Sequence, residues 1–340
     1  MSSALIYPAQ PEQILKGLGK LWTSLGQDER QQGKPTVVRA CALTLIVATD
    51  EDDMGFFASQ TISELMHEHP SRGIVLAISP KAEHAIEARV LAQCWKPFGK
   101  AEQICCEQIE ITTRPESWPH VGPTLIGLTV ADLPVIFWCR SRAALSPSAT
   151  RYQIAGIEAV LHLSTKMIVD TRGEDLDTSF DLIADWRSRG HLIADLQWAR
   201  CTPWRQPISQ IFDNVARQND LSKFHTIELA YAGETPCAAS YYVAGWLSAP
   251  HRARVILVRE DGHGPGIHRI TLKSDGETID FERTACDSLT LKSTNGRHRK
   301  YSFSDPEIHN LMNEELSITG FDSTFDTAFT RARELWRERK

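Results

Sequence analysis

Residues 37–49, VVRACALTLIVAT, form the strongest predicted strand of the chain. Asp50 follows as a helix N-cap, and the helix that it begins is expected to run to about His67. Pro70 ends this helix, and residues 73–78, GIVLAI, form a second short apolar strand. A strand–helix–strand unit of this kind predicts two parallel strands joined by a right-handed crossover.

Further strands and helices are predicted after this unit along the chain. Alternating apolar residues at 86–95 and 103–112 predict a hairpin, and residues 266–303 read as four consecutive short strands followed by two closing helices. Ser, Ala and Pro gather near 141–151, where we expect a domain join. The predicted class is α/β, with two α/β domains (1–145 and 146–340), the second with an antiparallel strand extension and closing helices.

Composition limits the classes of partner. The chain has 340 residues, 42% of them hydrophobic and 24% charged, with a net charge of −6. This is ordinary globular usage, and a mildly acidic protein lacks the excess of Lys and Arg that nonspecific nucleic-acid binding needs. The N-terminus has no signal-peptide pattern, and the longest apolar runs are too short to span a bilayer. We therefore expect a cytoplasmic protein with no nucleic-acid or membrane partner.

The eight cysteines follow no metal-binding or redox spacing. No CxxC pair occurs, and several cysteines lie within apolar strand patterns, where Cys behaves as a small hydrophobic residue. Adjacent Cys105 and Cys106 point to opposite faces of a strand, which disfavours a bond between them. We expect the cysteines to be free thiols, as is usual for a cytoplasmic protein.

Local catalytic signatures are absent. The sequence has no GxGxxG after a strand, no GxxxxGK[ST] and no GxSxG, so we expect no catalytic residue and no cofactor. His67-Glu68-His69 invites a metal interpretation, but the segment falls at a helix end and has no third ligand. We expect no metal site there.

Three segments are candidates for contact with other molecules. Arg72 lies in a loop between a helix and a strand, and Phe98 lies between Lys96 and Lys100 in a basic, aromatic hairpin loop of the kind that protein interfaces use. The helix start at 202–205, with Thr202 and Arg205, offers free backbone N–H groups to an anion. A local salt bridge, an ordinary hairpin connection and a capped helix with packed Trp204 are the alternative interpretations of these three segments.

Several segments together resemble a known family. They are VRAC at 38–41 with the strand that follows, HPSR at 69–72, PFGK at 97–100, QICCEQIEI at 103–111, DLQWAR at 195–200 and TPWR at 202–205. The sequence from about residue 37 to about residue 246 resembles the glucose-6-phosphate dehydrogenase assembly protein family, often called OpcA. The 103–111 and 202–205 segments are the most specific.

The resemblance implies a non-catalytic, allosteric activator. Such a protein binds glucose-6-phosphate dehydrogenase, favours its active oligomer and raises its apparent affinity for glucose 6-phosphate, which controls the oxidative pentose phosphate pathway and NADPH supply. Cyanobacterial relatives are longer and respond to thioredoxin through cysteines near the C-terminal end, whereas the last cysteine here is Cys286. The residues expected to contact the partner are Arg72, Lys96, Phe98, Lys100, Trp204 and Arg205.

Two other functions remain open from the residues alone. The first is an α/β enzyme that binds a sugar phosphate at the helix start 202–205, with His69 or His191 as acid or base. The second is a metal or ligand sensor built on residues 67–69. Co-purification with the dehydrogenase distinguishes the activator from both.

Overall fold

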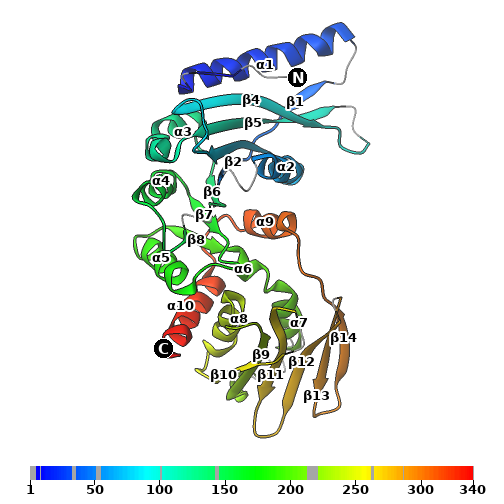
Figure 1. Cartoon of the computed structure of the whole chain (residues 1–340). Helices are drawn as coiled ribbons and strands as arrows, with labels where there is room; N and C mark the ends of the chain where they lie inside the picture. Colours follow the sequence, from blue (N-terminus) through cyan, green and yellow to red (C-terminus); the bar gives the residue numbers. More distant parts are fainter. Residues whose placement is uncertain are drawn as a thin grey trace. The chain divides into compact units, whose positions relative to one another are not determined.

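The computed structural model describes residues 5–7, 9–32, 36–50, 55–99, 102–141, 145–212, 221–261, 264–285 and 287–339. Its contacts divide the chain into two compact units. Unit 1 is Met1–Asp170, Asp177–Ala194 and Ile308–Gly320, and unit 2 is Thr171–Leu176, Asp195–Glu307 and Phe321–Lys340. Figure 1 labels the helices and strands of both.

Unit 1 is built on an eight-stranded sheet in the order β1-β5-β3-β2-β6-β7-β8, with β4 paired to β5 in antiparallel orientation. β2 pairs in parallel with both β3 and β6. The strands are β1 (Val37–Arg39), β2 (Leu43–Asp50), β3 (Ser71–Ile78), β4 (Ile86–Trp95), β5 (Gln103–Thr113), β6 (Val135–Cys139), β7 (Lys166–Val169) and β8 (Leu192–Asp195).

The predicted strand at 37–49 is two strands in the structure. β1 pairs with β5, whereas β2 pairs with β3 and β6, so the chain changes neighbours between Arg39 and Leu43. The backbone N–H of Ala42 donates to the carbonyl of Pro70 at 2.6 Å in the gap. Asp50, the expected helix N-cap, is instead the last residue of β2.

Helices cover both faces of this sheet. In Figure 1, α3, α4 and α5 lie on one side of the strands, and α2 and α9 lie on the other. Because both faces are covered, seven consecutive residues of β2 are buried, as is typical of parallel sheets. The helices are α1 (Pro11–Gln32), α2 (Gly55–Leu65), η2 (Pro115–His120, a 3₁₀ helix), α3 (Gly122–Leu128), α4 (Arg151–Leu161), α5 (Leu176–Ser188) and α9 (Ile308–Ser317).

Helix α9 comes from far along the chain and is fixed by a buried ion pair. The ammonium of Lys166 in β7 lies 2.7 Å from the carboxylate of Glu315, and both side chains are 4% exposed. The same ammonium donates to the carbonyls of Glu315 and Ile318, at 2.9 and 2.8 Å. Lys166 therefore caps the C-terminal end of α9, where unpaired carbonyls favour a cation.

Unit 2 contains a six-stranded sheet in the order β10-β9-β11-β12-β13-β14. β9 and β10 are parallel. The other neighbouring pairs, β9–β11, β11–β12, β12–β13 and β13–β14, are antiparallel. The elements are α6 (Leu196–Ala199), α7 (Thr202–Phe212), η4 (Leu221–Lys223, a 3₁₀ helix), β9 (Thr226–Ala232), α8 (Ala238–Ser248), β10 (Arg254–Arg259), β11 (Gly266–Lys273), β12 (Thr278–Ala285), β13 (Ser288–Ser293), β14 (His298–Ser302) and α10 (Ser323–Glu338).

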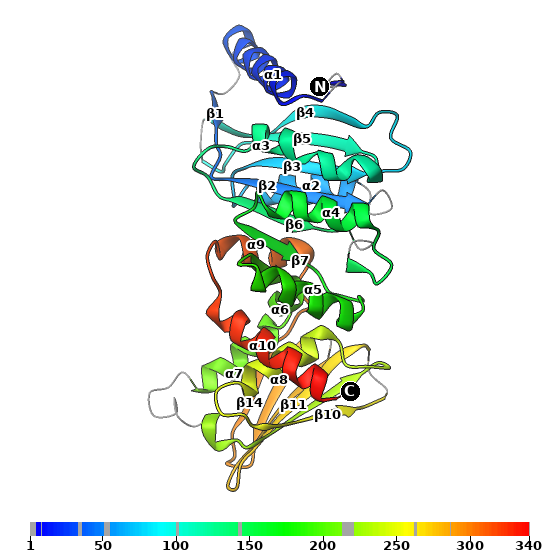
Figure 2. The same ribbon diagram turned by 90° about the vertical axis from the view of Figure 1, so that its left-hand side faces the viewer.

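Helix α8 packs on this sheet, and α10 packs on α8 (Figure 2). The two helices lie in close contact at Gly245. A Cβ at this position would lie 2.4 Å from the carbonyl oxygen of Ala328 and 2.8 Å from the nitrogen of Ala332. Only a residue without a side chain fits this contact.

The predicted α/β class, with two domains, an antiparallel extension and closing helices, is confirmed. The two units place α4 with the first sheet, although it follows the expected join at 141–151. The division into 1–145 and 146–340 stays a prediction. Among the described residues, none of the helices has both the length and the apolar composition that a membrane crossing requires.

Candidate functional site

Two motif segments of unit 1, HPSR and QICCEQIEI, meet at the buried carboxylate of Glu107. This residue of β5 is 4% exposed, and Arg72 in β3 donates to its Oε2 at 2.7 Å. Its Oε1 accepts from Arg39 and from the indole N–H of Trp22, each at 2.6 Å. Three elements besides β5 are therefore held by one carboxylate, and α1 is tied to the sheet through Trp22.

Arg72 is an internal residue in this arrangement. It is 7% exposed, and its second guanidinium contact is the carbonyl of Leu128, at 2.7 Å. A guanidinium in such a position satisfies two acceptors with its rigid fork of donors. Its burial favours the local salt bridge over direct contact with a partner.

The motif segments of unit 2 also meet each other. The guanidinium of Arg205 lies 3.8 Å from the centre of the Trp198 ring, and its Nη2 donates to Thr202 Oγ1 at 2.6 Å. Trp204 is 4% exposed and meets Phe303 edge-on, with ring centroids 5.1 Å apart. The geometry thus favours the packed helix start, because the groups expected to hold an anion are engaged with each other.

A second buried carboxylate begins the DLQWAR segment. Asp195 accepts from the hydroxyls of Thr171 at 2.6 Å and Tyr242 at 2.7 Å, and from the N–H of Gln197 at 2.9 Å. Burial, followed by the charge of Asp195, raises the pKa of Tyr242 well above its usual value. Tyr242 therefore stays a neutral hydrogen-bond donor over the physiological range.

The Phe98 loop, residues 96–102 between β4 and β5, is different because it exposes two of its described side chains, Lys96 and Phe98. Phe98 has a relative exposure of 106%, the highest of the large hydrophobic side chains described, and Lys96 is exposed. Gly99 has φ +73°, which turns the chain at the tip in a conformation that favours glycine. Lys100 lies outside the described residues. A fully exposed aromatic ring beside a cation is typical of interface anchors.

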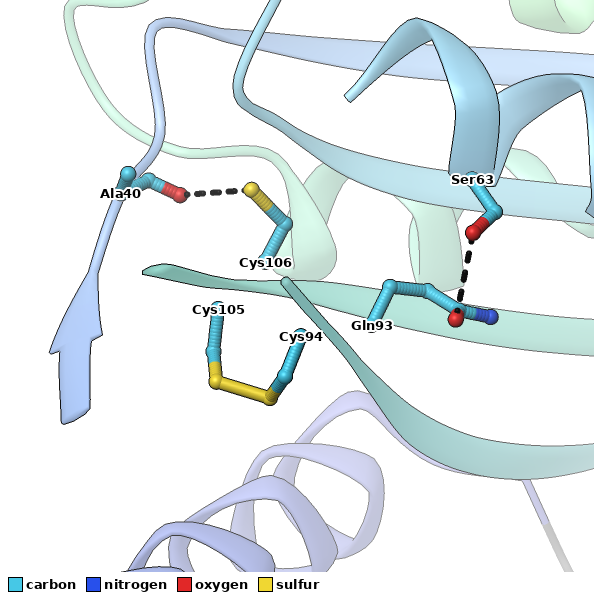
Figure 3. The surroundings of a disulfide bond; sticks show 6 residues. All are labelled: Ala40, Ser63, Gln93, Cys94, Cys105 and Cys106. Carbon is cyan, nitrogen blue, oxygen red and sulfur yellow. Dashed lines mark hydrogen bonds between the residues drawn. A yellow bond between two sulfur atoms is a disulfide. The ribbon is translucent and has the colours of Figure 1, made fainter. Parts of the chain in front are cut away.

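A disulfide lies at the base of this loop (Figure 3). Cys94 in β4 is bonded to Cys105, which lies directly opposite it in β5. The expectation of free thiols is therefore wrong for these two cysteines. The spacing of cysteines along the sequence does not show which residues of two strands lie opposite each other, so this pairing could not be expected from the spacing. Next to the bond, Trp95 packs on the ring of His67, with centroids 4.7 Å apart.

The bond and the ring contact both restrict the two strands that carry the loop. A cross-link that closes a short segment lowers the number of conformations open to it. The hairpin therefore presents Phe98 on a constrained base, which lowers the entropy lost when the ring is bound.

The histidines of the alternative functions have structural partners. His69 Nε2 lies 2.6 Å from Asn313 Oδ1, and the rings of His162 and His191 meet edge-on at 5.6 Å. Burial and the neighbouring His162 lower the pKa of His191. Among the described residues, no group of three or more His, Cys, Asp or Glu side chains could hold a metal ion. None of these observations favours the enzyme or the sensor.

The first sheet has a topological switch point between β2 and β6. Strands β3 and β5 follow on one side of β2, and β7 and β8 follow on the far side of β6, the order of doubly wound nucleotide-binding sheets. In such folds a glycine-rich turn after the first strand holds phosphate. Here β2 ends at Asp50, whose carboxylate accepts from Ser141 at 2.8 Å, and Glu51, Asp52 and Asp53 follow in the sequence. The carboxylate of Asp50 at this point repels a pyrophosphate.

Comparison with known families assigns the chain. Two family models, described as the N-terminal domain and the C-terminal domain of a glucose-6-phosphate dehydrogenase subunit, match residues 62–182 and residues 191–329 respectively. The chain belongs to the OpcA family. The resemblance drawn from the motif segments is thereby confirmed, and the two matches together include Glu107 and Asp195 of this OpcA chain.

A curated OpcA relative and several solved structures were compared with the chain. "Putative OxPP cycle protein OpcA" of Synechocystis sp. (strain PCC 6803) is 24% identical over 185 residues, which are 53% of this chain and 37% of that protein. An oxidoreductase from Sinorhizobium meliloti is 9% identical with a TM-score of 0.47, over 86% of this chain and 95% of the other. A probable dehydrogenase from Thermotoga maritima is 8% identical with a TM-score of 0.42, over 87% and 97%. Likenesses this weak carry no argument.

Sequence reasoning missed the two carboxylates that organise the OpcA motifs. Glu107 lies inside the strand predicted at 103–112, and Asp195 follows the apolar residues 192–194, where a charged residue is rare unless it is paired. That signal was available in the sequence. The identities of their partners were not, because Trp22, Arg39 and Arg72 come from three other elements.

Proposed function

We propose that this protein is a non-catalytic activator that binds glucose-6-phosphate dehydrogenase, favours its active oligomer and raises its apparent affinity for glucose 6-phosphate. The observation that carries the proposal is the match of both halves of the chain to domains described as belonging to a glucose-6-phosphate dehydrogenase subunit. The pentose phosphate pathway is then where it acts, and a cytoplasmic location stays a prediction.

The Phe98 loop is the contact surface that we favour. The motif residues Arg72, Trp204 and Arg205 are engaged inside their own units, so their role as direct contacts stays a prediction. Phe98 and Lys96 are exposed on a hairpin that is fixed at its base by the Cys94–Cys105 bond. One aromatic anchor with nearby charge can provide a large part of the binding free energy of an interface.

The absence of catalysis in this proposal has a physical basis at the switch point. Asp50 ends β2 where a dehydrogenase of this strand order holds its dinucleotide, and three further acidic residues follow it in the sequence. The role of a protein that binds the dehydrogenase therefore suits this chain better than the role of a second dehydrogenase.

The mechanism that we propose is a population shift. If the dehydrogenase exists in loose and competent arrangements, a protein that binds only the competent one increases its population. A coupling free energy of about 1–3 kcal/mol changes the apparent substrate affinity about 5–150-fold. By reciprocity, glucose 6-phosphate should tighten the complex by the same factor.

The test combines mass and kinetics. The protein is mixed with the dehydrogenase of its own organism, and molar mass by light scattering and initial rates against glucose 6-phosphate are measured on the same samples. We expect a larger assembly and a lower apparent KM. A dehydrogenase whose mass and kinetics do not change at any ratio would end the proposal.

Two matched variants locate the surface. Phe98→Ser should weaken binding about tenfold or more, because it removes an exposed anchor. Ile126→Ser changes a side chain of α3 in the same unit that is 57% exposed, and it should leave binding unchanged. Equal binding of both variants would remove the Phe98 loop from the interface without touching the proposed function.

A further inference from the structure

The last strand of the second sheet has one free edge. β14 pairs with β13 on one side, and no strand among the described residues pairs with its other side. The N–H of Ser293 donates to the carbonyl of Arg297, and the N–H of Phe303 donates to the carbonyl of Asp287. In an antiparallel pair, alternate residues direct both backbone groups to the partner strand. The residues between those alternate positions therefore direct their N–H and C=O groups outward: His298, Lys300 and Ser302.

This edge carries four consecutive basic residues, Arg297-His298-Arg299-Lys300, and all four side chains are exposed. Within the described parts of the chain, none of them forms an ion pair, whereas other surface cations, such as Lys292 with Glu282 at 3.6 Å, have acidic neighbours. The chain as a whole has a net charge of −6. The edge is thus a local cationic strip on an acidic protein.

The register shows how these charges are distributed. Arg299 lies opposite buried Leu291, and Lys300 lies opposite Thr290, so their side chains are on opposite faces of the sheet. A strand added at this edge would meet positive charge on both of its faces. It would also find unpaired backbone donors and acceptors at every second position.

Charge decides which strand can occupy the edge. Pairing with the same edge of a second copy would set basic residues against basic residues, which is destabilising, and charged edges commonly prevent such self-association. An acidic strand meets the opposite condition, since each of its carboxylates gains a cationic neighbour while its backbone pairs with β14. We propose that the free edge of β14 docks an extended acidic segment of a partner protein, which adds a seventh strand to this sheet.

This edge belongs to unit 2, whereas the Phe98 loop belongs to unit 1, and the inference does not depend on the identity of the partner of that loop. The edge would recognise any partner segment of the right chemistry, which is an unstructured, proline-free segment with carboxylates at neighbouring positions. Proline would remove a backbone donor that the added strand needs.

The probe is a short synthetic peptide of Glu, Val and Thr, labelled for fluorescence anisotropy. A second peptide of the same sequence, N-methylated at alternate amides, keeps the charge but cannot pair as a strand. We expect the first peptide to bind and the second to bind at least about tenfold more weakly, since it loses the backbone hydrogen bonds. Equal binding of the two peptides, or no binding of the first, would overturn the proposal.

Two protein variants test the location. His298→Glu/Lys300→Glu neutralises the formal charge of the strip, and Lys16→Glu/Lys20→Glu changes two exposed lysines of α1 in unit 1 in the same direction. The first should weaken peptide binding about tenfold or more and the second should not. An equal loss in both would mean that the peptide responds only to net charge, and the proposal would fail.

Amide exchange by NMR gives the residue-level result. The peptide should slow exchange at His298, Lys300 and Ser302, whose N–H groups face outward, and leave the residues that already face β13 unchanged. Protection elsewhere, or preferential binding of an RNA oligonucleotide of equal charge, would show that the strip serves another class of ligand and would overturn the inference.

Discussion

The guanidinium of Arg72 donates to the carboxylate of Glu107 at 2.7 Å across two neighbouring strands, β3 and β5. These residues belong to the HPSR and QICCEQIEI segments, two of the stretches by which the family is recognised. The segments are recognisable because they hold each other in place within unit 1. A motif of this kind identifies a fold, and a direct contact between Arg72 and a partner stays a prediction.

Removing one partner of this pair should destabilise the protein strongly. Arg72→Met leaves the buried Glu107 carboxylate with fewer donors, and breaking a buried ion pair costs about 3–5 kcal/mol. We expect a large fall in the urea midpoint. The matched control is Arg189→Gln, whose guanidinium is 37% exposed and pairs with Glu158, and which should cost less than about 1 kcal/mol. Similar midpoints for the two variants would contradict the assignment.

Much of the fold was predictable because hydrophobic patterning is local. The strand predicted at 37–49 includes both β1 and all but the last residue of β2, the alternation at 86–95 matches β4, and the basic loop between β4 and β5 lies where the hairpin pattern placed it. The pairing of Cys94 with Cys105 was not predictable. It depends on the register of two strands, and register is fixed by contacts that no single segment contains.

The candidate site was predictable only in part, because residue type and loop position are local but side-chain packing is not. Phe98 was chosen from its residue type and loop position, and it is exposed. Trp204 and Arg205 were chosen by the same reasoning and are packed against Phe303 and Trp198. Sequence identifies side chains able to bind, but whether the fold uses them internally depends on tertiary contacts, as for Trp204 and Phe303, about 100 positions apart.

The close contact between α8 and α10 should make Gly245 intolerant of substitution. Gly245→Ala sets a methyl group against backbone atoms of Ala328 and Ala332, which cannot rotate away, and should lower the free energy of unfolding by about 1–3 kcal/mol or more. Gly19→Ala in α1, with no atom within 4 Å of the added methyl, should instead stabilise by up to about 1 kcal/mol. Thermal unfolding of both variants checks this. A stabilised Gly245→Ala would contradict the observed helix packing.

Cysteine reactivity should separate into three classes. Burial raises the pKa of Cys106 to about 11 and of Cys139 to about 12, so both stay protonated and unreactive at about pH 8. Exposed Cys237 should be alkylated in the native protein. Cys94 and Cys105 should react only after reduction, as mass spectrometry with two isotopic forms of iodoacetamide would show.

One outcome of this experiment would contradict the Cys94–Cys105 disulfide. Alkylation of Cys94 or Cys105 by the first reagent, in native protein under non-reducing conditions, would show that these sulfurs are thiols.

Helix α9 should depend on Lys166. Lys166→Met removes the cation from the Glu315 carboxylate and from the carbonyls at the end of the helix. We expect faster amide exchange across residues 308–317 and a stability loss of about 3–5 kcal/mol. Lys292→Met, which removes an ammonium that is 57% exposed, should change neither quantity measurably. Unchanged exchange in Lys166→Met would mean that the ion pair does not hold α9.

The position of α9 limits how this chain can be divided. Residues 308–320 belong to unit 1, yet the segments before and after them belong to unit 2. A truncation between the two family matches would leave the first fragment without Glu315 and Lys166 without its counter-ion. Gene fusion, recombination or domain exchange cannot treat the halves as interchangeable modules, because each carries a piece without which the other is incomplete.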